Sequence, residues 1–166
     1  HLPEVVGKLL RYPDTANIGN SKQGGLKPRQ QLAIFQAIEE KQSGRMRTNL
    51  IDVGQEEIFS IEHIYPQEPE NWISELREWA VSPGLMKERM HVLGNLGVIP
   101  SRLNSELSNN AFSEKKKVVS DPKKEFPPLK VNGYWTRDTQ RRWTWEDIDA
   151  RGEQLLRLIL QYWKFE

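Results

Sequence analysis

The chain contains no cysteine and no apolar run long enough to span a membrane. The absence of cysteine excludes disulfides, zinc knuckles and thiol nucleophiles, so a structural zinc site is not expected. No signal peptide is visible either, and we therefore expect a cytoplasmic protein. The 24 basic and 23 acidic residues leave a formal net charge of only +1. Because no global field attracts nucleic acid, any such affinity must come from local positive patches.

The size of the chain predicts one compact domain. Its 166 residues include 37% hydrophobic ones, which is enough for a modest core. The first residue is histidine rather than methionine, so we expect a fragment of a longer protein.

The most informative segment is Ile61–Gln67, in which Glu62 stands directly beside His63. Asn95, within Leu93–Leu96, and Asn104 follow, nine positions apart. Phosphodiester hydrolysis needs a deprotonated water and a cation on the phosphate. Histidine is the natural base near neutral pH. One carboxylate and one amide oxygen are sufficient protein ligands for magnesium. These residues could therefore form a hard-metal nuclease site.

The expected local structure would bring these residues together. Residues 57–64 are rich in β-branched and aromatic side chains, so they predict a strand that ends at Glu62 and His63. Neighbouring strand residues point to opposite faces, so we expect the strand to end or bulge there. Residues 96–99 predict a second strand, and residues 100–107 a helix with Ser101 as N-cap. Asn104 would then face outward from the first helical turn, where the dipole favours a phosphate.

This order of strand, Glu-His, Leu-Gly-Asn-Leu, strand and Asn-bearing helix resembles the ββα-metal finger of HNH endonucleases. Together with Phe112-x-x-Lys115 and a Trp-rich C-terminal helix, it resembles more narrowly the nuclease domain at the C-terminal end of GmrSD-type modification-dependent restriction proteins. The resemblance covers residues 55–165. It implies an α+β fold, with a small ββα-metal finger embedded in a mostly helical domain.

The resemblance also assigns roles. It implies that His63 is the general base, that Glu62 and Asn104 bind Mg²⁺ or Mn²⁺, and that Asn95 braces the loop that holds the histidine. Lys115 would contact a phosphate. Many HNH proteins have Asp or His at the position of Glu62 and a final His at the position of Asn104. The Glu and Asn of this chain favour magnesium or manganese over zinc or nickel. Further candidates for DNA contact are Lys116, Lys117 and Asn109, and Asn109 is also the reserve metal ligand.

Each assignment has an alternative. Glu62 could be a surface carboxylate or pair with an arginine. Asn95 could be an ordinary turn residue after Gly94. The lysine run could be a solvated helix face. His91, just before the Leu-Gly-Asn-Leu motif, is predicted to be structural or at most peripheral to the site.

The rest of the chain is expected to support the finger. We predict an N-terminal helical wrap (1–54), the HNH core (55–120), a loop or hairpin (121–143) and a C-terminal helix (144–166). The wrap would contain a short helix at 2–11, a loop at 19–25 and a helix that begins at Pro28. Residues 70–81 predict an amphipathic helix, and Thr144 a helix cap. Core packing is the preferred interpretation of Trp135 and Trp143, with base stacking as the alternative.

The sequence therefore favours a metal-dependent DNA endonuclease that nicks or cleaves, within a restriction or anti-phage protein. The resemblance implies that an N-terminal sensor domain hydrolyses nucleotides and recognises modified DNA. One alternative is a catalytically silent HNH-like module for DNA binding or assembly, and another is a purely helical interaction domain. The sequence specifies neither the oligomeric state nor the modification that is recognised.

Overall fold

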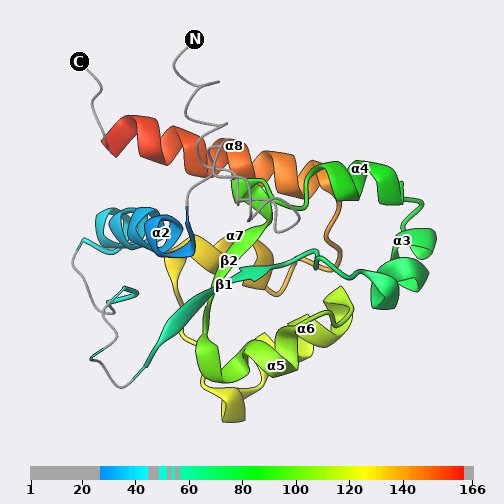
Figure 1. Ribbon diagram of the computed structural model, residues 1–166, viewed down its shortest axis with the longest axis horizontal. Helices are drawn as coiled ribbons and strands as arrows, with labels where there is room; N and C mark the ends of the chain where they lie inside the picture. Colours follow the sequence, from blue (N-terminus) through cyan, green and yellow to red (C-terminus); the bar gives the residue numbers. More distant parts are fainter. Residues whose placement is uncertain (1–26, 45–48, 52–53, 55–56, 163–166) are drawn as a thin grey trace.

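The fold is centred on a two-stranded antiparallel sheet (Figure 1). The computed structural model describes residues 27–44, 49–51, 54 and 57–162. Strand β1 (Phe59–His63) pairs with β2 (Leu96–Pro100), and the register runs from Phe59 opposite Pro100 to His63 opposite Leu96. Both strands occur where the sequence predicts them, and the pairing is regular to the end of β1. The α+β class is confirmed, and the purely helical alternative is wrong.

Short helical turns follow β2 directly and complete the ββα unit. The 3₁₀ turn η4 (Ser101–Leu103) leads into α5 (Asn104–Leu107). The predicted N-cap at Ser101 is wrong. Ser101 is already the first residue of η4, and neither this turn nor α5 has a side-chain cap. Asn104 is the first residue of α5, so its side chain stands on the outer surface of this unit.

The remaining helices surround this unit. Figure 1 shows α2 and α8 on one side of the sheet and α5 and α6 on the other. Helix α2 begins at the predicted Pro28, and the predicted helix at 70–81 is present as η2 followed by α3. The bounds are α2 Pro28–Ser43, η2 Glu70–Trp72, α3 Ile73–Glu78, α4 Pro83–Glu88, η3 Leu93–Asn95, α6 Phe112–Ser120, η5 Pro122–Lys124, η6 Lys130–Asn132, α7 Gly133–Thr136 and α8 Trp145–Tyr162.

Helix α8 begins with a capping box around Thr144. The Thr144 hydroxyl accepts from the Asp147 amide at 3.4 Å, and the Thr144 amide donates to the Asp147 carboxylate at 2.9 Å. These bonds satisfy two backbone donors that a helix start would otherwise leave unpaired. The predicted cap is therefore confirmed.

Two hydrophobic clusters flank the sheet. One joins α2, α8 and the strands around Phe35 and Val98, and the other is built on aromatic rings from distant segments. Trp135 and Trp143 are fully buried in the second cluster. Core packing is therefore confirmed for both, and neither is available for base stacking.

Helix α8 packs on η3, the turn that carries Asn95. Gly94 permits this approach, because a Cβ atom at that position would lie 2.0 Å from the Ile148 carbonyl oxygen of α8. The Gly-Asn pair therefore does more than form a turn. Its glycine lets the backbone of η3 touch α8, which fixes the position of Asn95.

Segment 121–143, predicted as a loop or hairpin, contains the short helical turns η5, η6 and α7. The predicted helix at 2–11 and loop at 19–25 lie outside the described residues. Within the described part of the chain, no helix has both the length and the apolar character that a membrane span requires.

Candidate functional site

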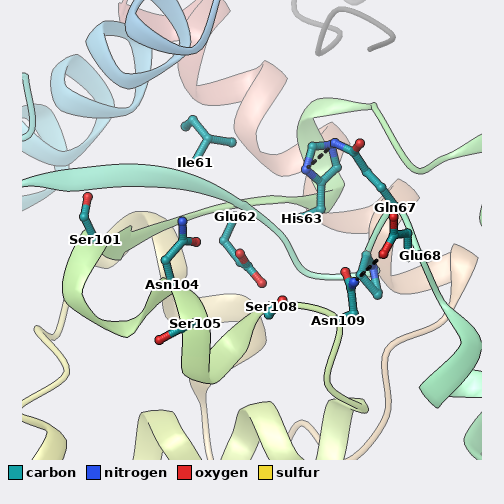
Figure 2. Close-up of a pocket in the computed structure, with 11 residues that line it drawn as sticks. Ile61, Glu62, His63, Gln67, Glu68, Ser101, Asn104, Ser105, Ser108 and Asn109 are labelled. Carbon is teal, nitrogen blue, oxygen red and sulfur yellow. Dashed lines mark hydrogen bonds between the residues drawn. The ribbon is translucent and has the colours of Figure 1, made fainter. Parts of the chain in front are cut away.

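A cleft of about 650 Å³ opens where β1 ends and α5 begins (Figure 2). It is lined by the end of β1, the loop that follows it, and the η4–α5 segment. The adjacent Glu62 and His63 line this cleft together with Asn104 and Asn109, which come from a distant segment of the sequence. The lining also includes Ile61, Pro66, Gln67, Glu68, Ser101, Ser105 and Ser108.

Glu62 and His63 leave β1 in opposite directions, as neighbouring strand residues do. Figure 2 shows the Glu62 carboxylate on the side of Asn104 and Ser108, whereas the His63 ring lies on the other side. No bulge is needed to bring them to one cleft. The strand ends at His63, and both side chains line the cleft at that end.

The Glu62 carboxylate is paired inside the protein with Lys115 of α6. The Lys115 Nζ donates to Glu62 Oε1 at 2.6 Å and to the His63 carbonyl oxygen at 2.9 Å. The Lys115 side chain is 0% exposed. Its ammonium is therefore not placed to meet a phosphate at the surface, contrary to the prediction. The physical reason is that Phe112, three residues earlier, is buried in the core and turns this face of α6 inward.

Burial dominates the electrostatics of this pair. It raises the pKa of Glu62, and the charge of Lys115 opposes that rise. It lowers the pKa of Lys115, and the charge of Glu62 opposes that fall. Each charge is therefore tolerated in the interior because the other is present.

The neighbouring lysines have other partners. The Lys116 Nζ donates to the carbonyl oxygens of Trp135, Thr136 and Arg137, at 3.2, 2.8 and 2.8 Å, where α7 ends. Lys117 is 71% exposed and pairs with Glu114 one turn away. The three consecutive lysines thus perform three different tasks. Of these three lysines, only Lys117 remains a solvent-exposed candidate for DNA contact.

Asn95 is fully buried, and its side chain makes four hydrogen bonds. Its Oδ1 accepts from the Tyr65 amide at 2.8 Å and from Trp143 Nε1 at 3.1 Å. Its Nδ2 donates to the carbonyl oxygens of Tyr65 and Met90, at 2.9 and 2.8 Å. The side chain therefore ties the loop after His63 to η3 and to the core, as a brace would.

Asn104 and Asn109 face the cleft differently. Asn104 is exposed, and its side chain has no hydrogen-bond partner among the described residues. The Asn109 Nδ2 donates to Glu68 Oε2 at 3.0 Å across the mouth of the cleft. The Asn104 amide is thus the better placed of the two to bind something that enters from outside.

The His63 ring contacts His91, a residue that sequence reasoning left out of the site. His63 Nε2 lies 3.2 Å from His91 Nδ1, and the rings meet edge to face with centroids 5.2 Å apart. On the other side, Gln67 Nε2 lies 3.4 Å from His63 Nδ1. Burial, then the charges of His91 and Lys115, lower the pKa of His63 to about 3. His91 thus touches the candidate base although it does not line the cleft, and its structural or peripheral role stays a prediction.

Arg151 of α8 also supports the site from behind. Its fully buried guanidinium donates to the carbonyl oxygens of Gly94, Leu96 and Val131, at 2.8, 2.6 and 2.8 Å. It therefore staples η3 to β2 and η6. Helical periodicity alone could have flagged Arg151, because it stands on the buried face of α8 between Ile148 and Leu155.

The cleft offers oxygen donors of the kind that small hard cations prefer. Glu62 supplies a carboxylate, of which Lys115 binds Oε1, and Asn104 supplies an amide oxygen. No cluster of three or more His, Cys, Asp and Glu ligands occurs in the described ranges. This donor set fits magnesium or manganese, which retain waters and bind substrate phosphate, better than zinc.

Comparison with known proteins adds an independent observation. A family model described as the C-terminal domain of GmrSD restriction endonucleases matches residues 19–158. No curated protein and no solved structure matches the chain. The matched range includes every residue of the cleft described above.

Proposed function

The chain belongs to the family of C-terminal domains of GmrSD restriction endonucleases, and from this we propose that it hydrolyses DNA phosphodiester bonds at the cleft, with His63 as general base. One observation carries the proposal: the adjacent acid and histidine of β1 and an exposed asparagine from the distant α5 line a single cleft at the ββα unit. A restriction nuclease domain implies DNA as substrate.

His63 would take a proton from the attacking water. Its lowered pKa of about 3 keeps the ring neutral at physiological pH, which is the form that accepts a proton. The same shift makes it a weak base in the protein alone. Phosphates of bound DNA beside the ring would raise the pKa again, because negative charge stabilises the imidazolium.

Glu62 and Asn104 would hold Mg²⁺ or Mn²⁺. A bound divalent ion supplies positive charge to the scissile phosphate and to the leaving 3′ oxygen. Lys115 occupies one Glu62 oxygen and holds the carboxylate in place, which leaves the other oxygen as a donor. Asn95 would act through position alone, because it is buried and meets only protein groups.

DNA would reach the cleft past Asn109, which lines it, and Lys117 on the exposed face of α6 would be a further contact outside the cleft. In the parent protein, the proposal places a nucleotide-hydrolysing sensor before this domain. The sensor domain would deliver the nuclease to modified DNA. Such delivery is consistent with the net charge of only +1 on this chain. The biological role would be restriction of foreign DNA in the cytoplasm.

The first experiment is cleavage of supercoiled plasmid in magnesium or manganese, with EDTA as control. His63→Ala, Glu62→Gln and Asn104→Ala should each lower the rate at least about 100-fold, because each removes a group on which the reaction depends. Gln154→Ala, on the exposed face of α8 across the sheet from α5, is the matched control and should cleave like wild type.

The outcomes separate the proposal from its alternative. Metal-dependent nicking that the three cleft variants lose supports the nuclease. If folded wild type binds plasmid without cleaving it, and His63→Ala binds equally well, the chain is a silent DNA-binding module. The parent protein with its own N-terminal domain should then be assayed too, because loss of cleavage there as well would refute the proposal.

A further inference from the structure

We propose that His91 is a positioning residue for His63: it accepts a hydrogen bond from His63 Nε2 and so fixes the tautomer whose lone pair lies on Nδ1. This inference rests on the proposed function, in which His63 is the base. It adds a second histidine, 28 positions away, to the site.

The contact geometry supports a directed hydrogen bond. The distance of 3.2 Å between His63 Nε2 and His91 Nδ1 is within hydrogen-bonding range, and the edge-to-face arrangement aims a nitrogen of one ring at the other. Both rings are partly buried. Two neutral imidazoles can form this bond only if one nitrogen donates and the other accepts.

The chemistry selects the direction. If His91 donated, His63 Nε2 would spend its lone pair on that bond and Nδ1 would carry the proton, so the ring could not take a proton from water. If His63 donates, its Nδ1 is the basic nitrogen. The Gln67 amide nitrogen, 3.4 Å from Nδ1, donates but does not accept, so this long contact is compatible with the same tautomer but is too weak to impose it. Gln67 lines the cleft, which places Nδ1 on the substrate side.

The backbone is built to keep the two histidines together. Asn95 holds the Tyr65 backbone two residues after His63, and its Nδ2 also donates to the Met90 carbonyl oxygen one residue before His91. A single buried amide thus fixes both segments that carry the imidazoles. A partner that orients a histidine and sets its tautomer is a recurring device at metal and catalytic sites, where its loss costs about 10- to 100-fold in activity.

The test uses two variants of His91 and two readouts. His91→Phe keeps a ring but removes the acceptor, whereas His91→Asn keeps an oxygen near the position of Nδ1. Long-range ¹H–¹⁵N spectra of metal-free protein at neutral pH report the His63 tautomer directly. Wild type and His91→Asn should show the Nε2–H form, and His91→Phe should lose that preference. Thermal melting verifies that each variant is folded.

Cleavage kinetics provide the second readout. His91→Phe should lower kcat about 10- to 100-fold with KM changed less than about twofold, and His91→Asn should recover most of the loss. The spectra decide the inference even if no cleavage occurs, so its failure is distinguishable from failure of the proposed function. A wild-type His63 protonated at Nδ1, or an unchanged tautomer in His91→Phe, would overturn it.

Discussion

Two asparagines nine positions apart have opposite environments in this structure. Asn95 is 0% exposed, and all of its hydrogen bonds are made with protein groups. Asn104 is exposed on the cleft, and its side chain has no hydrogen-bond partner within the described residues. Asparagine therefore holds the backbone in place at position 95 and is available for binding at position 104.

The contrast divides the whole site. On the buried side, Asn95, Arg151 and Lys115 fix the backbone and the acid through bonds inside the protein. On the cleft side, Asn104 and the His63 ring face the space that a substrate would enter. Variants on the buried side should therefore change stability first, and those on the cleft side should change function first.

The largest loss of stability is expected for Lys115→Met. Removing the ammonium leaves the Glu62 carboxylate buried without a counter-charge, which costs about 3–5 kcal/mol of unfolding free energy. Urea unfolding at neutral pH measures it. The matched control is Lys117→Met, which lies two residues later and is exposed, and should change stability by no more than about 0.5 kcal/mol.

A double variant tests the cause. Adding Glu62→Leu to Lys115→Met removes both charges, so most of the lost stability should return. If the double variant is no more stable than the single one, the loss comes from packing around the lysine stem rather than from the unpaired carboxylate.

Asn95→Ala is expected to cause the next largest loss of stability. It leaves the Tyr65 amide, the Trp143 indole and two carbonyl groups without their partner, and we expect a loss of about 3 kcal/mol. Urea unfolding measures this loss, and the Tyr65 amide and the Trp143 indole N–H should exchange with solvent faster. A loss below about 1 kcal/mol would mean that water replaces the amide and that Asn95 is not the brace described here.

The ββα unit was predictable because its signals are local. β-Branched and aromatic residues, a proline at residue 66 and the Gly-Asn turn predict two strands and a turn without knowledge of the remaining fold. Thr144, followed by Glu146 and Asp147, likewise predicts the start of α8 from local sequence alone. The convergence of Glu62, His63 and Asn104 followed from the order of these elements.

The roles of Lys115 and His91 were not predictable in the same way. A lysine run has the same appearance whether its members point inward or outward, and Lys115 is buried because α6 packs Phe112 against Trp143, a residue from a distant segment. His91 meets His63 only because η3 brings two loops together through Asn95. Both contacts depend on tertiary packing between distant segments, which single-sequence patterns do not encode.

Acid should weaken the fold through His63. Its pKa is about 3 in the folded protein, against an ordinary value of 6.5 that applies to the unfolded chain. Between these values the unfolded chain binds a proton that the folded protein does not, so stability is complete above pH 6.5 and falls as pH decreases. From pH 7 to 5 we expect a loss of about 1–2 kcal/mol from this residue. Urea unfolding of wild type and His63→Asn at both pH values isolates the contribution of His63. An equal loss of stability between pH 7 and 5 in the two proteins would contradict the prediction.

Asn104→Ala should have the smallest effect on stability and thereby sharpens the contrast with Asn95. The side chain is exposed and makes no hydrogen bond to the described part of the protein, so unfolding free energy should change by no more than about 0.5 kcal/mol. Binding of Mn²⁺, followed by calorimetry without DNA, should weaken at least about tenfold, because one of two oxygen donors is lost. Gln154→Ala should change neither quantity. If Asn104→Ala unfolds as easily as Asn95→Ala, burial does not distinguish an asparagine that holds the backbone from one that binds metal. If Asn104→Ala binds Mn²⁺ like wild type, the metal ligand must be another residue. Asn109 is then the first candidate, because it lines the same cleft.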